Sequence, residues 1–163
     1  YYLNPVYWAA ANQITFGTDA AHFSPEAPCT RAQVVTFLWR SFGCPKGNGL
    51  NPFADVSRDA YYYDAVQWAV SRGITDGTDE THFSPEDSCT RAQVVTFLWR
   101  ADGEKTASAF HAFDDVPVDS YYFHAVSWAL SQSITYGTDA DHFSPENTCT
   151  RAQVVTFLYR ASR

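Results

Sequence analysis

Methionine is absent from the 163 residues of this sequence, and so are long apolar runs and an excess of basic residues. No run approaches the roughly 20 apolar residues that span a bilayer, so the sequence predicts no membrane segment and no membrane partner. Its start does not resemble a signal peptide, and with the missing methionine this leads us to expect a processed or truncated end at Tyr1. The formal net charge is −7. That charge disfavours binding to nucleic acid and requires any anionic ligand to be held by local cationic pockets.

Cysteine is also scarce, with four residues in the chain. Three of them, Cys29, Cys89 and Cys149, occupy equivalent positions, and Cys44 stands apart from them. We expect the three to be small buried residues just before a helix rather than members of a disulfide framework. No CxxC pair and no close Cys/His pair is present, so the sequence does not favour a zinc site.

What the sequence does contain is a repeat. The stretch CTRAQVVTFL occurs three times without change, at residues 29–38, 89–98 and 149–158. The surrounding residues keep the same spacing, which defines units at 1–43, 61–103 and 121–163, joined by connectors at 44–60 and 104–120. Because 45% of the residues are hydrophobic and 17% aromatic, we predict one folded domain over 1–163, with repeats at 1–43, 44–103 and 104–163.

Each unit has the pattern of helix, loop and helix. Residues 61–74 place apolar side chains at helical spacing, with Gly73 suited to the left-handed position that ends a helix. A loop rich in Gly, Asp, Thr and Pro follows. The second helix is expected to begin at Thr90, because Gln93 three residues later completes a capping box. The pairs Thr30/Gln33 and Thr150/Gln153 repeat this start.

An arginine stands at the unfavourable end of each second helix. Arg31, Arg91 and Arg151 are expected in the first turn, where a cation costs about 0.3–1 kcal/mol when exposed. Something negative should therefore compensate each charge. One explanation is an internal carboxylate, such as Asp55 or Asp115 of the connectors, in a salt bridge between units. The other is a bound anion, held by the guanidinium and by free N–H groups of the helix start.

The motifs in this order resemble the S-layer homology domain family. Phe-x-Asp-Val precedes a helix bearing Tyr and Trp, and Gly-Ile-Thr-x-Gly, Phe-Ser-Pro and Thr-Arg-Ala-Gln follow. The first glycine of Gly-Ile-Thr-x-Gly is present only as Gly73. The resemblance covers essentially the whole chain. It implies a mainly α domain of three helix-loop-helix repeats in a pseudo-threefold arrangement around a central three-helix bundle. It further implies anchoring at the cell surface by binding a secondary cell-wall polymer, often anionic and pyruvylated, in grooves between units of bacteria with a Gram-positive type of envelope. Other parts of a larger surface protein are possible partners.

The resemblance also implies which residues bind the ligand. The arginine of the Thr-Arg motif is a groove residue in the family. We therefore expect a ligand-binding set made of the arginines, their neighbouring glutamines, the loop glycines and the connector aspartates: Arg31, Arg91, Arg151, Gln33, Gln93, Gln153, Gly17, Gly77, Gly137, Asp55 and Asp115. The family usually has glutamate where this sequence has glutamine. That change keeps the capping box and removes a negative charge. The first unit lacks Phe-x-Asp-Val, which leaves any groove built from that segment in question.

Other repeated polar residues favour no further chemistry. Three loop histidines, His22, His82 and His142, lack a pattern of metal-ligating neighbours, so no metal or other cofactor is expected. Asp19, Asp79 and Asp139 lack the dense alternation of an EF-hand and suit turns. Repetition of one acid at Glu26, Glu86 and Glu146 gives no differentiated pair for glycoside cleavage, and we expect no enzyme activity. The competing hypothesis is a structural or protein-interaction module whose arginines form salt bridges between repeats.

Overall fold

The structure is a computed structural model that describes residues 1–107 and 113–163, so the connector at 104–120 lies partly outside the described residues. This part of the chain forms six helices, two in each repeat: α1 (Leu3–Ala11), α2 (Arg31–Ser41), α3 (Tyr63–Ser71), α4 (Arg91–Ala101), α5 (Phe123–Ser131) and α6 (Arg151–Ala161). Among the described residues, β-structure is limited to three isolated β-bridges between repeats. The prediction of a mainly α fold with helix-loop-helix repeats is confirmed. No helix of the described residues is both long and apolar enough to cross a membrane.

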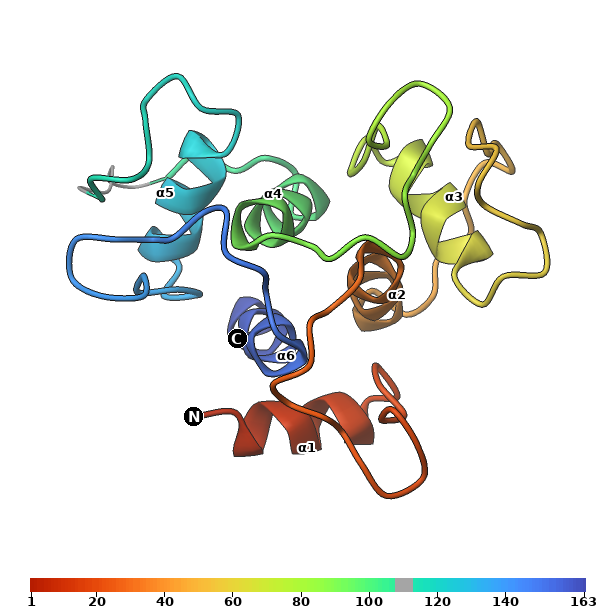
Figure 1. The fold of residues 1–163 in the computed structure, drawn as a ribbon, viewed down its shortest axis with the longest axis horizontal. Coiled ribbons are helices and arrows are strands. Elements are labelled where there is room, and N and C mark those ends of the chain that lie inside the picture. Colours follow the sequence, from red (N-terminus) through yellow and green to blue (C-terminus); the bar gives the residue numbers. More distant parts are fainter. Residues whose placement is uncertain (108–112) are drawn as a thin grey trace.

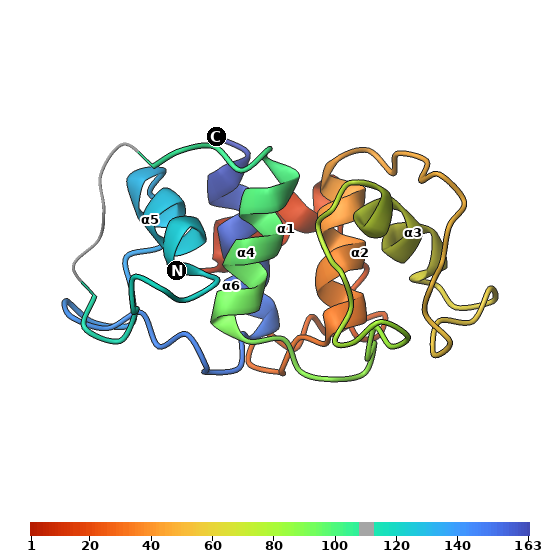
Figure 2. The same cartoon turned by 90° about the horizontal axis from the view of Figure 1, so that it is seen from above.

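The second helix of each repeat lies at the centre of the molecule. Figure 1 shows α2, α4 and α6 end-on, with α1, α3 and α5 around them, and each inner helix contacts the other two. In Figure 2 the inner helices stand side by side, with their starts at the same end. Each outer helix packs on the inner helix of another repeat: α3 on α2, α5 on α4 and α1 on α6. The first helix of the chain therefore closes against the last.

Small and β-branched side chains fill the space between the helices. Buried alanines on the outer helices, such as Ala65 and Ala69, allow close approach to the inner helices. The inner helices present Val35 and Leu38, and their counterparts, to the shared core. Each inner helix is an amphipathic segment whose stability comes mainly from this burial.

The predicted capping boxes are present in all three inner helices. In α4 the Gln93 backbone N–H donates to Thr90 Oγ1 at 3.3 Å, and Gln93 Oε1 accepts from the Thr90 N–H at 3.1 Å. The ends of the outer helices also follow one pattern, in which Gly73 has a φ of 65°. Gln13 and Ser133 adopt a φ of 58° at the equivalent positions, where the lack of glycine makes the predicted helix end weaker.

Backbone hydrogen bonds close a ring between the repeats just before the inner helices. The N–H of Cys29 donates to Cys149 O at 3.0 Å, that of Cys89 to Cys29 O at 2.9 Å, and that of Cys149 to Cys89 O at 2.9 Å. The three side chains are buried, as predicted, and are free thiols. Burial raises the pKa of Cys29 and of Cys89 to about 12. These cysteines therefore join the repeats through their backbones and remain protonated at neutral pH.

Candidate functional site: grooves between the repeats

The N–H groups at the start of each inner helix are already occupied. In α2 the Arg31 N–H donates to Asp87 O at 2.9 Å, and the Ala32 N–H donates to Pro85 O at 3.0 Å. The Gln33 N–H donates to the capping threonine at 3.3 Å. The same bonds recur in α4 and α6, with carbonyls of the next repeat in cyclic order. The expectation that free N–H groups would hold an anion is therefore wrong, because the tight turn of a neighbouring repeat supplies their acceptors.

The arginines of the repeated motif are buried cations. Arg31, Arg91 and Arg151 are each 3% exposed. The Arg31 Nε donates to Phe83 O at 2.8 Å, and its guanidinium lies 4.9 Å from the Phe83 ring centroid and 5.5 Å from that of Phe97. Arg91 and Arg151 make the equivalent bonds to Phe143 O and Phe23 O, each at 2.9 Å. Each arginine thus joins two repeats through a carbonyl and two aromatic rings.

No carboxylate pairs with these guanidinium groups among the residues that the structure describes. Within this part of the chain, the salt bridges to Asp55 or Asp115 that one of the two explanations required are absent. Burial lowers the pKa of Arg31 and Arg91, yet arginine's pKa lies so far above neutrality that both remain charged. One terminal nitrogen of each, Nη2, is buried with no hydrogen-bond partner, whereas Arg151 Nη2 donates to Thr15 Oγ1 at 3.3 Å. Buried cations without a counter-ion are costly, which makes them candidates for anion binding.

The connector aspartates hold the turn against which each arginine rests. Asp55 accepts from the N–H groups of Phe83 and Ser84 at 2.9 and 2.8 Å. Asp115 does the same for the third repeat, at 2.8 and 2.7 Å. The carbonyl of the same phenylalanine receives the arginine's Nε. These aspartates therefore fix the arginine's acceptor, and neither lines the grooves described below.

Two grooves contain the motif arginines. The Arg31 groove has a volume of about 340 Å³ and lies between α2, α4 and the loop after α3. It brings Arg31 together with Gly77 and Gln93, three residues that the sequence selected from two different repeats. The Arg91 groove, of about 430 Å³, does the same for Arg91, Gly137 and Gln153. The third set, Arg151, Gly17 and Gln33, has the equivalent Nε bond and capping box.

Backbone conformation and close packing explain why the loop positions 77 and 137 are glycine. Gly77 has a φ of 88°, and a Cβ there would lie 2.5 Å from His82 O and 2.5 Å from the Phe53 ring. Gly137 is confined in the same way by His142 O and Phe113. Glycine is thus required for the loop to pass beneath the connector phenylalanine, and the groove wall is bare backbone at these points.

Each groove contains a second arginine that the sequence pattern did not single out. Arg100 lines the Arg31 groove and Arg160 the Arg91 groove, and their Nη1 atoms donate to Ile74 O and Ile134 O, each at 3.0 Å. Arg100 and Arg160 are spaced by sixty residues in the sequence, like the other repeated residues. However, a cation in the last turn of a helix suits the helix dipole, so the position raised no question.

Tyrosines from a further repeat complete the walls. Tyr121 lines the Arg31 groove, and Tyr1 lines the Arg91 groove. Burial raises the pKa of both hydroxyls, and nearby glutamates, Glu146 and Glu26, raise it further. Both therefore remain neutral hydrogen-bonding groups at physiological pH.

The remaining candidates lie elsewhere. Asp79 accepts from the N–H groups of Thr81 and His82. The bond from the Thr81 N–H and the contact with the His82 ring, 3.0 Å away, lower the pKa of Asp79 to about 2. These loops are turns, as predicted. No cluster of three metal-ligating side chains was found in the described part of the chain. Trp68 and Trp128 are core residues.

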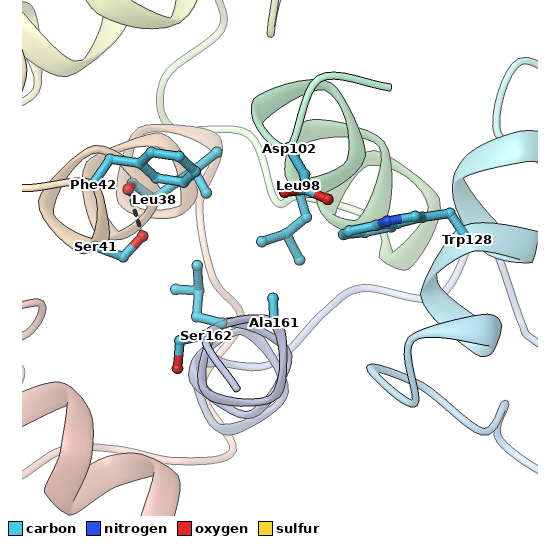
Figure 3. Close-up of a pocket in the computed structure, with 9 residues that line it drawn as sticks. Leu38, Ser41, Phe42, Leu98, Asp102, Trp128, Ala161 and Ser162 are labelled. Atoms are coloured by element: carbon cyan, nitrogen blue, oxygen red, sulfur yellow. Dashed lines mark hydrogen bonds between the residues drawn. The ribbon is translucent and has the colours of Figure 1, made fainter. Parts of the chain in front are cut away.

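A smaller apolar cavity of about 160 Å³ lies at the opposite end of the inner helices from the cysteine ring. Figure 3 shows Leu38 and Leu98 facing it, with Trp128 reaching in from α5 and Asp102 nearby. It contains none of the residues selected from the sequence. The grooves, with their cations and bare backbone, are the candidate site.

The three repeats match the model of one known protein family. The S-layer homology domain model matches residues 1–35, 52–95 and 112–155, one match for each repeat. The chain therefore belongs to the S-layer homology domain family. Domains of this family are anchoring modules of S-layer and cell-surface proteins, and this membership places the chain at the cell surface.

Curated relatives include surface proteins and enzymes. The Surface-layer 125 kDa protein of Lysinibacillus sphaericus is 30% identical over 150 residues, which cover 88% of this chain and 12% of that protein. The S-layer protein of Bacillus thuringiensis subsp. finitimus is 23% identical over 90% of this chain and 18% of its own length. Exoglucanase XynX of Acetivibrio thermocellus is 24% identical over 92% of this chain and 14% of its own length. The chain thus spans less than a fifth of each of these relatives.

Proposed function

We propose that this domain anchors a surface protein noncovalently by binding an anionic saccharide of a secondary cell-wall polymer in its inter-repeat grooves. The single observation that carries the proposal is the set of buried arginines that line grooves and have no carboxylate partner. A desolvated cation gains strongly from an anion of matching geometry, and a guanidinium fork suits a carboxylate.

Within each groove, the arginine, the glycine backbone and the hydroxyl groups have different roles in the proposed binding. The Nε bond to the phenylalanine carbonyl and the two aromatic rings fix the plane of the guanidinium. The bare backbone at Gly77 or Gly137 permits close approach by a sugar ring. Tyrosine and threonine hydroxyls at the rim supply neutral hydrogen bonds to sugar hydroxyls. No reaction is proposed, because the grooves contain no differentiated acid and base.

The alternative of a protein-interaction module has less support. It relied on arginines engaged in salt bridges between repeats, and these bridges are absent from the described residues. The arginines do connect repeats, but each uses one nitrogen on a carbonyl and leaves the charge uncompensated. A purely structural role does not account for buried charges that have no carboxylate partner.

The test is sedimentation of the domain with purified cell-wall polymer. Arg31→Met and Arg91→Met preserve bulk in the aromatic sandwich and remove the charge. Arg58→Met is the matched control, because Arg58 is exposed and lies outside both grooves. We expect the double variant Arg31→Met/Arg91→Met to remain folded by circular dichroism and to lose at least tenfold in affinity, whereas the control binds normally. Normal binding by the folded double variant would refute the role of these arginines. Polymer stripped of its acidic substituents should bind weakly to all three proteins.

A further inference from the structure

One position differs between grooves that are otherwise built alike. It lies between the repeated Thr and Gly of the loop and is Phe16, Asp76 or Tyr136 in the three repeats. Its neighbours on both sides do not vary: Thr15, Thr75 and Thr135 before it and Gly17, Gly77 and Gly137 after it. A change from aromatic to acidic at an otherwise constant position alters the charge of one groove only.

The variable side chain faces the arginine at the end of the inner helix. The guanidinium of Arg160 lies 5.3 Å from the Tyr136 ring centroid, and that of Arg40 lies 4.9 Å from the Phe16 ring. In the second repeat Arg100 Nη1 instead lies 3.8 Å from Asp76 Oδ2. The arginines themselves are held alike, with Nη1 donating to a backbone carbonyl at 3.0–3.1 Å in each repeat. The difference therefore comes from the loop residue and not from the arginine.

The two grooves consequently differ in charge. The Arg91 groove is lined by two arginines and no carboxylate. The Arg31 groove is lined by two arginines and the carboxylate of Asp76. An acidic group entering the Arg31 groove meets the unpaired Arg31, but the second cation, Arg100, is already paired with the negative charge of Asp76. In the Arg91 groove, Tyr136 is 61% exposed and also offers a ring on which a sugar can stack.

We propose that residue 76 and its counterparts determine groove specificity, so that the acidic sugar binds preferentially in the Arg91 groove and Asp76 disfavours it in the Arg31 groove. This inference rests on the proposed function. Asp76 is largely exposed and solvent screens its charge, so the expected preference is modest, about fivefold in affinity.

The experiment reads the two grooves separately. The backbone amides of Gly77 and Gly137 follow the variable position and lie in different grooves, so each serves as a reporter in a ¹⁵N–¹H NMR titration. The probe is a methyl hexoside that carries a pyruvate ketal, and the same hexoside without the ketal is the reference. In the wild type we expect the Gly137 signal to reach half-saturation at about one fifth of the ketal concentration that Gly77 requires.

Variants that change the charge at residues 76 and 136 then test whether these residues cause the difference in affinity between the grooves. Asp76→Asn should bring the Gly77 response to within about twofold of the Gly137 response. Tyr136→Asp should weaken the Gly137 response about fivefold and leave Gly77 unchanged. Glu80→Gln is the control, because it makes the same charge change on an exposed residue outside the groove.

The outcomes separate this inference from the function on which it rests. Equal half-saturation of both wild-type signals, or an Asp76→Asn titration identical to that of the wild type, overturns the specificity role while anion binding stands. If neither glycine responds to the ketal in any variant, saccharide binding in the grooves fails as well. A Glu80→Gln effect as large as that of Asp76→Asn would show that overall charge, not position 76, controls binding.

Discussion

Replacement of Asp115 by alanine tests how the fold supports the arginine. The carboxylate accepts from the N–H groups of Phe143 and Ser144 at 2.8 and 2.7 Å, and the Phe143 carbonyl accepts from Arg91. A hydrogen bond to a charged group contributes about 1.5–3 kcal/mol. Asp115 is half-buried, so we take the lower figure for each bond and expect Asp115→Ala to lower the free energy of unfolding by about 3 kcal/mol.

The expected loss in the free energy of unfolding is large enough to measure, and we expect the Asp115→Ala variant to stay folded. Domains of this size lose about 2–4 °C in melting temperature per kcal/mol, so the expected shift is about 6–12 °C by calorimetry. Urea titration should show a lower midpoint with an unchanged slope, because the surface exposed on unfolding is the same. Asp55→Ala should behave alike, since its two bonds have nearly the same lengths.

Asp114→Ala is the matched control for this experiment. Asp114 is the neighbouring residue and is exposed, and its backbone bond to Asp141 O does not need the side chain. We expect it to change stability by less than about 0.5 kcal/mol, as is usual for surface substitutions. If Asp115→Ala and Asp114→Ala unfold at the same midpoint, the carboxylate does not hold the turn and the reasoning is refuted.

The other predictions concern the loops and the thiols. Ser133→Gly should raise stability by about 0.5–1 kcal/mol in urea titration, because Ser133 has a φ of 58°, and Gly73→Ala should lower it by a similar amount; opposite signs would contradict the strain argument. A thiol reagent should label the folded chain once, at the exposed Cys44, and Cys44→Ser should remain unlabelled, because burial raises the pKa of the repeat cysteines. The pKa of His82, followed by NMR, should lie above its ordinary value of 6.5 and should fall in Asp79→Asn. Because that pKa is raised on folding, the His82 contribution to stability is complete below about pH 6.5 and is lost as the pH rises through the folded value.

Much of the site was predictable because it depends on local patterns. Thr90 and Gln93 lie three residues apart, so the capping box follows from the sequence, and the repeated motif brings Arg, Gly and Gln to equivalent places. The clustering of Arg31 with Gly77 required the family resemblance, since these residues belong to different repeats.

The partners of the arginines were not predictable from local rules. The acceptors of Arg31 and its helix start are carbonyls more than fifty residues away, and every residue has a carbonyl, so no side-chain pattern marks them. Asp55 had the right charge to be an arginine partner but binds the N–H groups of the same turn instead. Arg100 was overlooked because its position is also favourable in an ordinary helix.

The packing of α1 on α6 affects how this domain unfolds. A linear array of repeats has two free ends and can lose its outermost repeats one at a time. Here the first outer helix covers the last inner helix, and the cysteine backbones link all three repeats in a circle. Removing any one repeat exposes two interfaces at once, so we expect no stable two-repeat intermediate and a single cooperative transition. Under a pull applied at one end, such a domain resists peeling and yields only as a whole, which suits a module that must hold to a wall.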